Sequence, residues 1–188
     1  MDRYKEELRR LTAEKIPGME DALVFGEGPA NPKLMLIGEA PGEQETLAGR
    51  PFVGKAGKNL ERFLELAGLC REDIYISNTV KIRPTKLGKT GRLSNRPPSR
   101  EEIELFRPWL LREIDMIRPQ AIATLGNVPL KALAGNKVTI GDVHGQWVPF
   151  GEGTRLFALY HPASMIYNRS LESVYEADVL RLAGEIIR

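Results

Sequence analysis

Cysteine and long apolar runs are the two features that this sequence most clearly lacks. Cys70 is the only cysteine among 188 residues, which excludes an intrachain disulfide and an all-cysteine metal site. No stretch approaches the roughly 20 apolar residues of a membrane-spanning helix, and the first ten residues, MDRYKEELRR, contain no apolar run typical of a secretory signal. We therefore expect a cytoplasmic protein. A hydrophobic content of 42% suffices for a full core, so we expect one domain over residues 1–188.

Basic residues are concentrated in one segment, although the net charge of the chain is only +2. Residues 81–100 contain seven basic side chains and no acidic one, and their prolines and glycines should break any regular structure. A long basic loop suits a polyanion such as a nucleic-acid backbone, although a simply solvated loop can have the same composition. The basic residues are Lys81, Arg83, Lys86, Lys89, Arg92, Arg96 and Arg100.

Short apolar runs of strand length alternate along the chain with segments of helical periodicity. Buried strands are predicted at residues 34–37, 73–80, 121–125 and 154–160, and a further short strand is predicted at residues 22–25. Helices are predicted at residues 1–16, 56–67, 99–117, 128–134 and 171–187, and a hairpin-like excursion at residues 138–148. Strands separated by helices indicate an α/β sandwich with a mainly parallel sheet.

Candidate site residues follow the ends of three predicted strands. Glu39 follows the first strand, Asn78 lies close to the end of the second, and His161 follows the last. The carboxyl ends of parallel strands meet at one edge of a sheet, where ligands bind in such folds. Each residue also has a structural interpretation: Glu39 as a surface turn residue, Asn78 as a turn cap, and His161 as a structural side chain beside Pro162.

Together these residues suit the recognition and removal of a nucleic-acid base. An amide offers a donor and an acceptor at once, and a histidine can donate a hydrogen bond to developing negative charge. Phe52 follows a rigid turn and offers an aromatic platform, although it could also belong to the core. With the basic loop, the set indicates a protein that reads a base of DNA and excises it.

Three ordered motifs connect these residues to a known family. They are GEAPGEQETLAGRPFVGKAG at residues 38–57, ISNTVKIRP at residues 76–84 and HPAS at residues 161–164. Their order and spacing resemble the uracil-DNA glycosylase superfamily, and within it the family-four enzymes, over most of residues 22–187. The resemblance implies a three-layer α/β/α sandwich with a central, mainly parallel four-stranded sheet. It also implies a monofunctional, monomeric enzyme of DNA base excision repair, which hydrolyses the N-glycosidic bond of deoxyuridine and leaves an abasic site.

The resemblance further implies roles for single residues of the base pocket. Phe52 would stack on the flipped uracil, Asn78 would pair with its O4 and N3–H edge, and His161 would stabilise the departing uracil anion through O2. Glu39 is expected to position water or to stabilise the sugar cation, so Glu39 and His161 are the expected catalytic residues. Other branches of the superfamily carry an acidic residue where this chain has alanine. The remaining expected uracil contacts are Ala40, Pro41 and Glu45, the last of which would exclude the methyl group of thymine.

Contacts to DNA are expected from two further segments. The basic loop after the second motif should approach the DNA backbone, and the loop after HPAS should enter the duplex as the base leaves. The residues concerned are Lys81, Arg83, Arg92, Arg96, Met165, Ile166 and Arg169.

The chain departs from the family pattern at the iron–sulfur cluster, which family-four enzymes hold with four cysteines. Ile82 replaces the cysteine of the KCRP-like motif, the helix position falls at about Phe106, and residues 12–25 contain no cysteine. Cys70 matches none of the four positions. We therefore expect no cofactor and no metal, with Ile82 and Phe106 providing apolar packing in place of the cluster.

Alternative functions remain open from the sequence. A related branch traps DNA covalently through a histidine in a basic insertion, but residues 85–95 contain no histidine, so we expect turnover. No conspicuous catalytic lysine indicates strand cleavage. A non-catalytic or weakly catalytic lesion-binding module, or a glycosylase with a shifted preference for other deaminated bases, would carry similar motifs.

Overall fold

The computed structural model describes residues 1–89, 91–151 and 153–186, apart from the side chains of residues 166 and 167. Its strands are β1 (Leu34–Gly38), β2 (Tyr75–Asn78), β3 (Thr85–Leu87), β4 (Leu93–Asn95), β5 (Ala121–Leu125), β6 (Trp147–Val148) and β7 (Arg155–Leu159). Its α-helices are α1 (Asp2–Lys15), α2 (Glu43–Ala48), α3 (Lys55–Ala67), α4 (Arg100–Ile117), α5 (Asn127–Ala134), α6 (Ile140–Val143), α7 (Ser164–Tyr167) and α8 (Glu172–Ile186). Two short 3₁₀ helices, η1 (Arg71–Asp73) and η2 (Arg169–Leu171), complete the elements.

The central sheet has the strand order β2-β1-β5-β7-β6. The first four strands are parallel, whereas β6 pairs antiparallel with β7 at the edge. Successive side chains of β1 point to opposite faces of the sheet, and both faces are covered. The mainly parallel α/β fold expected from the sequence is therefore confirmed, and the structure adds a fifth, two-residue strand to the four that were expected.

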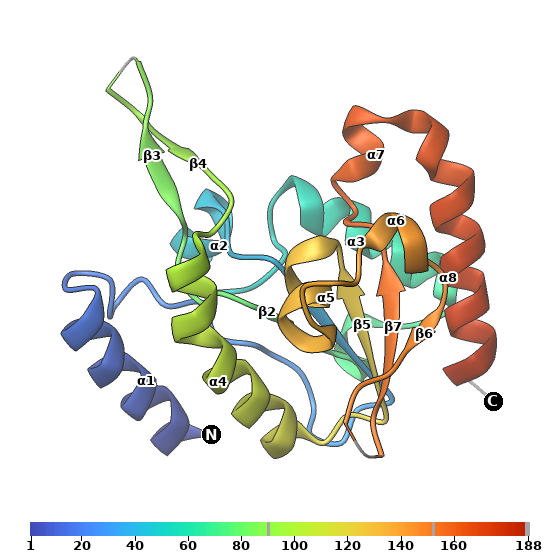
Figure 1. Ribbon diagram of the computed structural model, residues 1–188, viewed down its shortest axis with the longest axis horizontal. Helices are drawn as coiled ribbons and strands as arrows, with labels where there is room; N and C mark the ends of the chain where they lie inside the picture. Colours follow the sequence, from blue (N-terminus) through green and yellow to red (C-terminus); the bar gives the residue numbers. More distant parts are fainter. Residues whose placement is uncertain (90, 152, 187–188) are drawn as a thin grey trace.

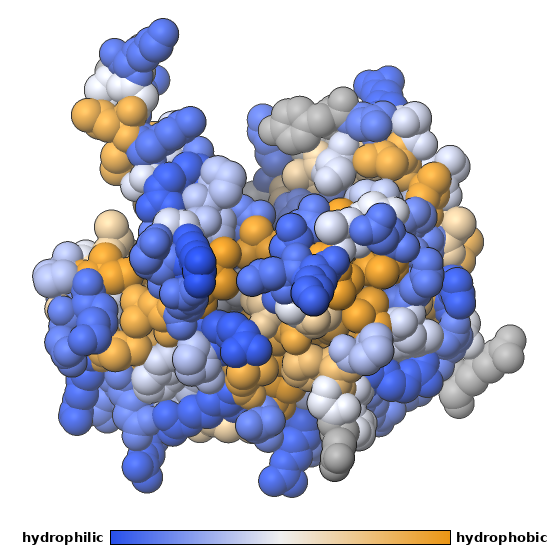
Figure 2. Space-filling view, viewed as in Figure 1, coloured by the Kyte–Doolittle hydropathy of each residue, from blue (hydrophilic) through white to orange (hydrophobic). Residues whose placement is uncertain are grey.

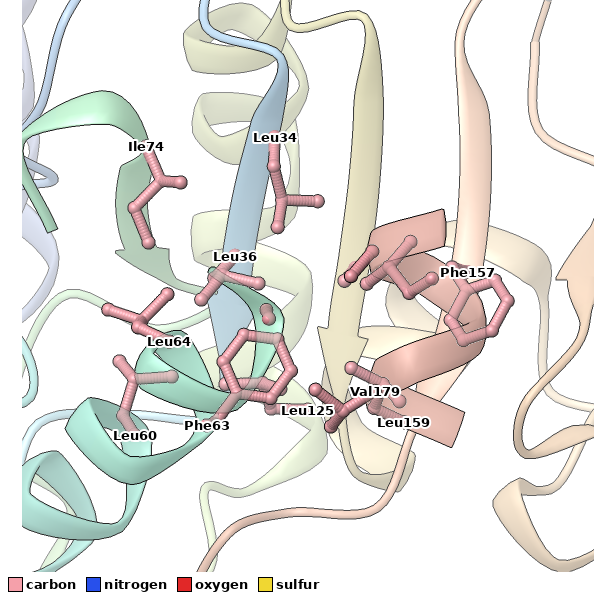
Figure 3. Close-up of a cluster of buried hydrophobic side chains, with 14 of the residues drawn as sticks. Leu34, Leu36, Leu60, Phe63, Leu64, Ile74, Leu125, Phe157, Leu159 and Val179 are labelled. Carbon is pink, nitrogen blue, oxygen red and sulfur yellow. The ribbon is translucent and has the colours of Figure 1, made fainter. Parts of the chain in front are cut away.

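Helices cover the two faces of the sheet and make it the middle of three layers (Figure 1). On one face, Leu34 and Leu36 pack in a cluster with Phe63 of α3 and Val179 of α8 (Figure 3). On the other face, Met35 and Ile37 belong to a cluster that includes residues of α4 and α5. Both faces of β1 are thus apolar, which explains the unbroken apolar run of this strand.

Three local predictions were wrong. Residues 22–25 form no strand, although the N–H of Val24 donates to the carbonyl of Lys81 (2.8 Å). Residues 85–95, expected to be irregular, form the antiparallel β3–β4 hairpin. The excursion at residues 138–148 is a short helix, α6, followed by the edge strand β6, rather than a hairpin of two strands. Ser99 caps α4, since Ser99 and Glu102 exchange hydrogen bonds.

A third apolar cluster joins α1 to α4 where family-four enzymes bind their iron–sulfur cluster. Ile82 (2% exposed) and Phe106 (0%) are buried in it with Tyr4 and Leu8, as expected from the sequence. Tyr4 packs edge-on against Trp109, with ring centroids 5.6 Å apart. Hydrocarbon and aromatic rings supply no thiolate, so these residues do not fit an iron–sulfur cluster. Among the described residues, no group of three or more His, Cys, Asp or Glu side chains is arranged to hold a metal ion.

We therefore predict that the purified protein contains no stoichiometric iron or acid-labile sulfide. The physical reason is that the apolar side chains of this cluster occupy the position and donate no ligand. Colorimetric iron and sulfide analysis, with an absorption spectrum between 350 and 450 nm as roughly the diagnostic range for such clusters, checks the prediction. About four irons per chain would contradict it.

In the part of the chain that the structure covers, no helix combines the length and the apolar character required to cross a membrane.

Candidate active site

An open recess of about 580 Å³ lies at the carboxyl edge of the parallel strands. The strand ends deliver the predicted residues to it, because β1 leads into Glu39, β2 ends at Asn78, and β7 is followed closely by His161. Phe52 reaches the same recess from the segment between α2 and α3. Four of the seven residues that sequence motifs singled out for the base pocket therefore line one cavity. Ala40, Pro41 and Glu45 line it as well.

Asn78 places a free amide at this recess. The residue is only 3% exposed, and none of the described residues makes a hydrogen bond to its side chain. Its backbone carbonyl is fixed, however, because the ammonium group of Lys81 donates to it (2.7 Å). The amide atoms are not buried in the protein but open onto the recess, where they can pair with a ligand that carries both a donor and an acceptor.

Gly38 provides the space that Asn78 and Phe52 occupy. It is the register partner of Asn78 across the β1–β2 pair. A Cβ atom at Gly38 would lie 2.4 Å from the Asn78 Oδ1 atom and 2.5 Å from the Cζ atom of the Phe52 ring. Both distances are too short for real contacts, so only glycine allows the two side chains to face the recess together.

We predict that Gly38→Ala displaces both side chains and reduces the base excision that the sequence resemblance implies by about a hundredfold, since misplacement by about 1 Å can cost that much. The single-turnover rate of this expected reaction on a uracil-containing oligonucleotide measures the effect. Gly184→Ala on α8 is the matched control, because a Cβ atom there meets nothing within 4 Å. Full activity of Gly38→Ala would show that the pocket does not depend on this contact.

Phe52 is held in an unusual backbone conformation. Its φ angle is +53°, in the left-handed region that residues other than glycine rarely adopt, and its ring is 5% exposed. The carbonyl of Phe52 packs against Gly57, where a Cβ atom would lie 2.1 Å from the Phe52 oxygen. The ring lies nearly parallel to that of His161, with centroids 6.2 Å apart and an interplanar angle of 28°. Such strained positions persist only where the surrounding structure enforces them, and they are common at functional sites.

Glu45 helps to hold the turn that carries Phe52 in this conformation. One carboxylate oxygen accepts hydrogen bonds from the N–H groups of Val53 (3.0 Å) and Gly54 (2.7 Å), and the other accepts from Gly42 (3.1 Å). The side chain therefore ties the start of α2 to the turn that carries Phe52. A carboxylate with three backbone donors shapes the wall of the recess more rigidly than a free side chain would.

His161 is neutral in this environment. Burial lowers its pKa from 6.5 to about 4. The backbone N–H of Ala163 donates to Nδ1 (3.1 Å), so Nδ1 is the acceptor and the proton of the neutral ring lies on Nε2. Nε2–H is thus available as a hydrogen-bond donor.

Glu39 contributes a half-buried carboxyl group to the recess. Burial raises the pKa of its carboxyl group above the ordinary value of 4.5. No described residue makes an ion pair or hydrogen bond with this carboxylate. The group can therefore accept a proton or a hydrogen bond from a bound molecule.

The predicted DNA contact at Lys81 was wrong. Its side chain is 0% exposed, and its ammonium group contacts Glu113 (2.5 Å), the Ser77 hydroxyl (2.6 Å) and the Asn78 carbonyl. Glu113 also accepts hydrogen bonds from Ser77 and Tyr75. A lysine enclosed in this way cannot reach a phosphate. Its hydrogen bond to the Asn78 carbonyl instead fixes the end of β2.

The other predicted DNA contacts differ in exposure. Arg92 and Arg169 are exposed, whereas Arg83 binds Asn95 (2.7 Å) and Arg96 makes two hydrogen bonds of 2.7 Å to Glu102. Met165 is half-buried and packs against the core cluster beneath α8. The side chain of Ile166 lies outside the described residues.

Sequence reasoning missed several residues that line the recess. Asn95 and Arg96 reach it from the base of the β3–β4 hairpin, and Lys55 reaches it from the first turn of α3. Arg96 had been expected to bind DNA but not to line the pocket. The Gly54-Lys55 pair, which follows Val53, was a usable signal for Lys55, because a helix begins there. Asn95 gave no such signal, since its place depends on the hairpin.

Comparison with known proteins gives consistent similarities. A sequence model described as the uracil DNA glycosylase superfamily matches residues 25–181. A type-4 uracil-DNA glycosylase of Saccharolobus solfataricus is 39% identical over 186 residues, covering 95% of this chain and 82% of the relative. A type-4 uracil-DNA glycosylase of Thermotoga maritima is 36% identical over 173 residues, covering 92% and 86%. The crystal structure of wild-type SMUG2 from Pedobacter heparinus is similar in fold, with a TM-score of 0.55 and 16% identity over 84% of this chain and 76% of that one.

Proposed function

This chain belongs to the uracil-DNA glycosylase superfamily, in its type-4 family, and from that premise we propose that the recess binds a uracil base flipped out of DNA. The protein is a uracil-DNA glycosylase of DNA repair. Such an enzyme hydrolyses the bond between the base and deoxyribose. The products are free uracil and an abasic site.

The observation that carries the proposal is the unpaired amide of Asn78 in the wall of the recess. Its NH₂ group donates to uracil O4, and its carbonyl accepts from uracil N3–H. Cytosine presents an amino donor and an unprotonated ring nitrogen at the same two places, so the same amide orientation rejects it. Phe52 stacks on the base, and Glu45 closes the wall beside the position of the thymine methyl group.

His161 stabilises the leaving group. As the bond between C1′ and N1 breaks, its electron pair passes to the uracil ring and is shared with O2. The Nε2–H of neutral His161 donates to O2 and offsets this charge. This hydrogen bond lowers the activation free energy by about 3 to 4 kcal/mol. Because the ring starts neutral, the hydrogen bond strengthens as the anion forms.

Glu39 completes the hydrolysis on the sugar side. Its carboxylate stabilises the cationic character that develops at C1′ and orients a water molecule toward that carbon. The oxygen of the water bonds to C1′, and one proton of the water leaves. That proton balances the charge of the departing uracil anion. Ala40 and Pro41 form the neighbouring wall.

The protein is further proposed to act as a monomer on single- or double-stranded DNA in the cytoplasm. Exposed Arg92 and Arg169 provide charge for the phosphates on two sides of the recess. Size-exclusion chromatography with light scattering tests the monomeric state.

The decisive experiment uses a labelled oligonucleotide that contains one uracil, single-stranded or opposite guanine or adenine. We expect alkali-labile cleavage by the wild-type protein, and a rate at least about a hundredfold lower for Asn78→Ala, because a buried recognition group is lost. Asn136→Ala, an exposed asparagine outside the recess, is the control. Preferential binding of the uracil strand without any cleavage would instead support a lesion-binding module.

The pH dependence follows from the two shifted pKa values. Glu39 acts as a carboxylate, and burial raises its pKa, so excision should fall as the pH drops through a value above 4.5. His161 acts as the neutral ring, and its pKa of about 4 means that it contributes no transition between pH 5 and 8. Single-turnover rates across this range check both points. The Glu39→Gln variant should be slower at every pH, and its rate should no longer fall at low pH. A transition near pH 6.5 that persists in this variant would contradict the roles assigned to Glu39 and His161.

A further inference from the structure

We infer that the β3–β4 hairpin is an apolar wedge that packs on the DNA strand beside the extracted uracil, an inference that rests on the proposed function. Leu87 is 71% exposed and Leu93 is 59% exposed, and the two are register partners in the hairpin. Directly opposed residues of an antiparallel pair point to the same face, so the two leucines form one apolar patch. Figure 2 shows apolar surface on the projecting hairpin.

The register also shows where this patch faces. Alternate residues of a strand share a face, so Leu93 lies on the same face as Asn95, and Leu87 on the same face as Thr85. Asn95 lines the recess. The leucine pair therefore lies two residues, about 7 Å, further out along the hairpin than the residue that lines the recess.

The basic side chains beside the two leucines indicate what kind of partner this patch binds. Lys86, Lys89 and Arg92 are exposed beside the leucines and make no ion pair with any residue that the structure describes. An apolar pair surrounded by cations matches a polymer that is negatively charged and also exposes apolar faces. A DNA strand provides both, because its bases expose stacking faces once one nucleotide is flipped out.

The hairpin and α7 rise from the same side of the molecule, toward which the strands β5 and β7 point (Figure 1). A strand that delivers its base into the recess therefore passes against the inner face of the hairpin. With a base rise of about 3.4 Å, a patch about 7 Å away meets the nucleotide two positions from the uracil, which a trinucleotide with central uracil lacks. The contact is made to ring faces and sugars, so it should be independent of sequence.

The test compares the double variant Leu87→Thr/Leu93→Thr with the wild type on two substrates. Threonine keeps a high strand propensity and removes most of the apolar surface. On a single-stranded 20-mer with a central uracil, the dissociation constant should rise about tenfold, while the slope of its logarithm against salt concentration stays unchanged because no cation is lost. On a trinucleotide with uracil in the middle, the rate of excision should not change. Leu180→Thr on α8, 54% exposed, is the matched control.

A fluorescent base, 2-aminopurine, placed two positions from the uracil gives a direct signal. Its fluorescence should rise when the wild-type protein unstacks it, and the rise should be lost in the double variant but kept in Leu180→Thr. Unchanged affinity and fluorescence in a double variant that excises uracil would overturn the wedge and leave the proposed function intact. An equal loss on the 20-mer and the trinucleotide would also overturn it, since the damage would then lie in the pocket. If the wild type bound uracil-containing DNA without excising uracil, the proposed function would fail. The fluorescence comparison would still show whether the hairpin unstacks the neighbouring base.

Discussion

Replacing His161 with alanine should slow uracil excision by about a hundredfold to a thousandfold, the cost of losing one preorganised donor to a developing anion. The ring lies against Phe52, and the N–H of Ala163 assigns its proton to Nε2. The donor is therefore in place before the bond breaks. In His161→Ala, Asn78 still binds the Watson–Crick edge of the base, so kcat should fall far more than the affinity for uracil-containing DNA.

The chain contains one other histidine, and it provides the control. His144 lies against Tyr160 and binds Asp178 (2.8 Å), away from the recess. His144→Ala should keep its rate per folded molecule, with urea unfolding used to correct for any change in stability. If His161→Ala retained more than about a tenth of the wild-type kcat, the leaving group would not depend on this residue.

Replacing Lys81 with methionine should lower the free energy of unfolding by about 3 to 5 kcal/mol, because Glu113 is left buried without its cation. Both side chains are fully enclosed, at 0% and 1% exposure. The same change removes the donor to the Asn78 carbonyl, so molecules that stay folded should also bind uracil less well. Urea unfolding at 25 °C and excision under single-turnover conditions measure the two effects.

A double variant separates the charge from the shape. Lys81→Met/Glu113→Gln removes both charges and should recover part of the stability, because no unpaired ion remains. Lys86→Met, at an exposed lysine of the hairpin, should change the stability by less than about 0.5 kcal/mol. Equal stability of Lys81→Met and Lys86→Met would show that the buried pair contributes nothing.

The strands of the sheet could be predicted from sequence because their signal is local. Residues 34–37 are an unbroken apolar run and residues 121–125 are apolar except for Thr124, both are bounded by turn residues, and β1 and β5 form there. The strand ends then placed Glu39, Asn78 and His161 near one another. That geometry needs only the rule that parallel strands share their carboxyl edge.

Lys81 could not be placed from its own segment, because it stands between the apolar residues Val80 and Ile82 at the start of a stretch rich in basic residues. Its partner is Glu113 on α4, 32 residues away. A signal existed on α4, where Glu113 falls on the buried stripe with Phe106, Leu110 and Ile117. A carboxylate on a core-facing stripe requires a buried cation or donor, but the sequence does not say which residue supplies it. The β3–β4 hairpin was missed for a related reason, because strands of three residues have almost no periodicity.

The apolar contact between α1 and α4 has a consequence for the cell that makes this protein. Tyr4, Leu8, Ile82 and Phe106 pack without any added group, so this part of the fold forms from the chain alone. Its synthesis then needs neither iron uptake nor the proteins that assemble iron–sulfur clusters. Oxidants that dismantle such clusters leave hydrocarbon packing intact, so removal of uracil can continue during iron starvation or oxidative stress.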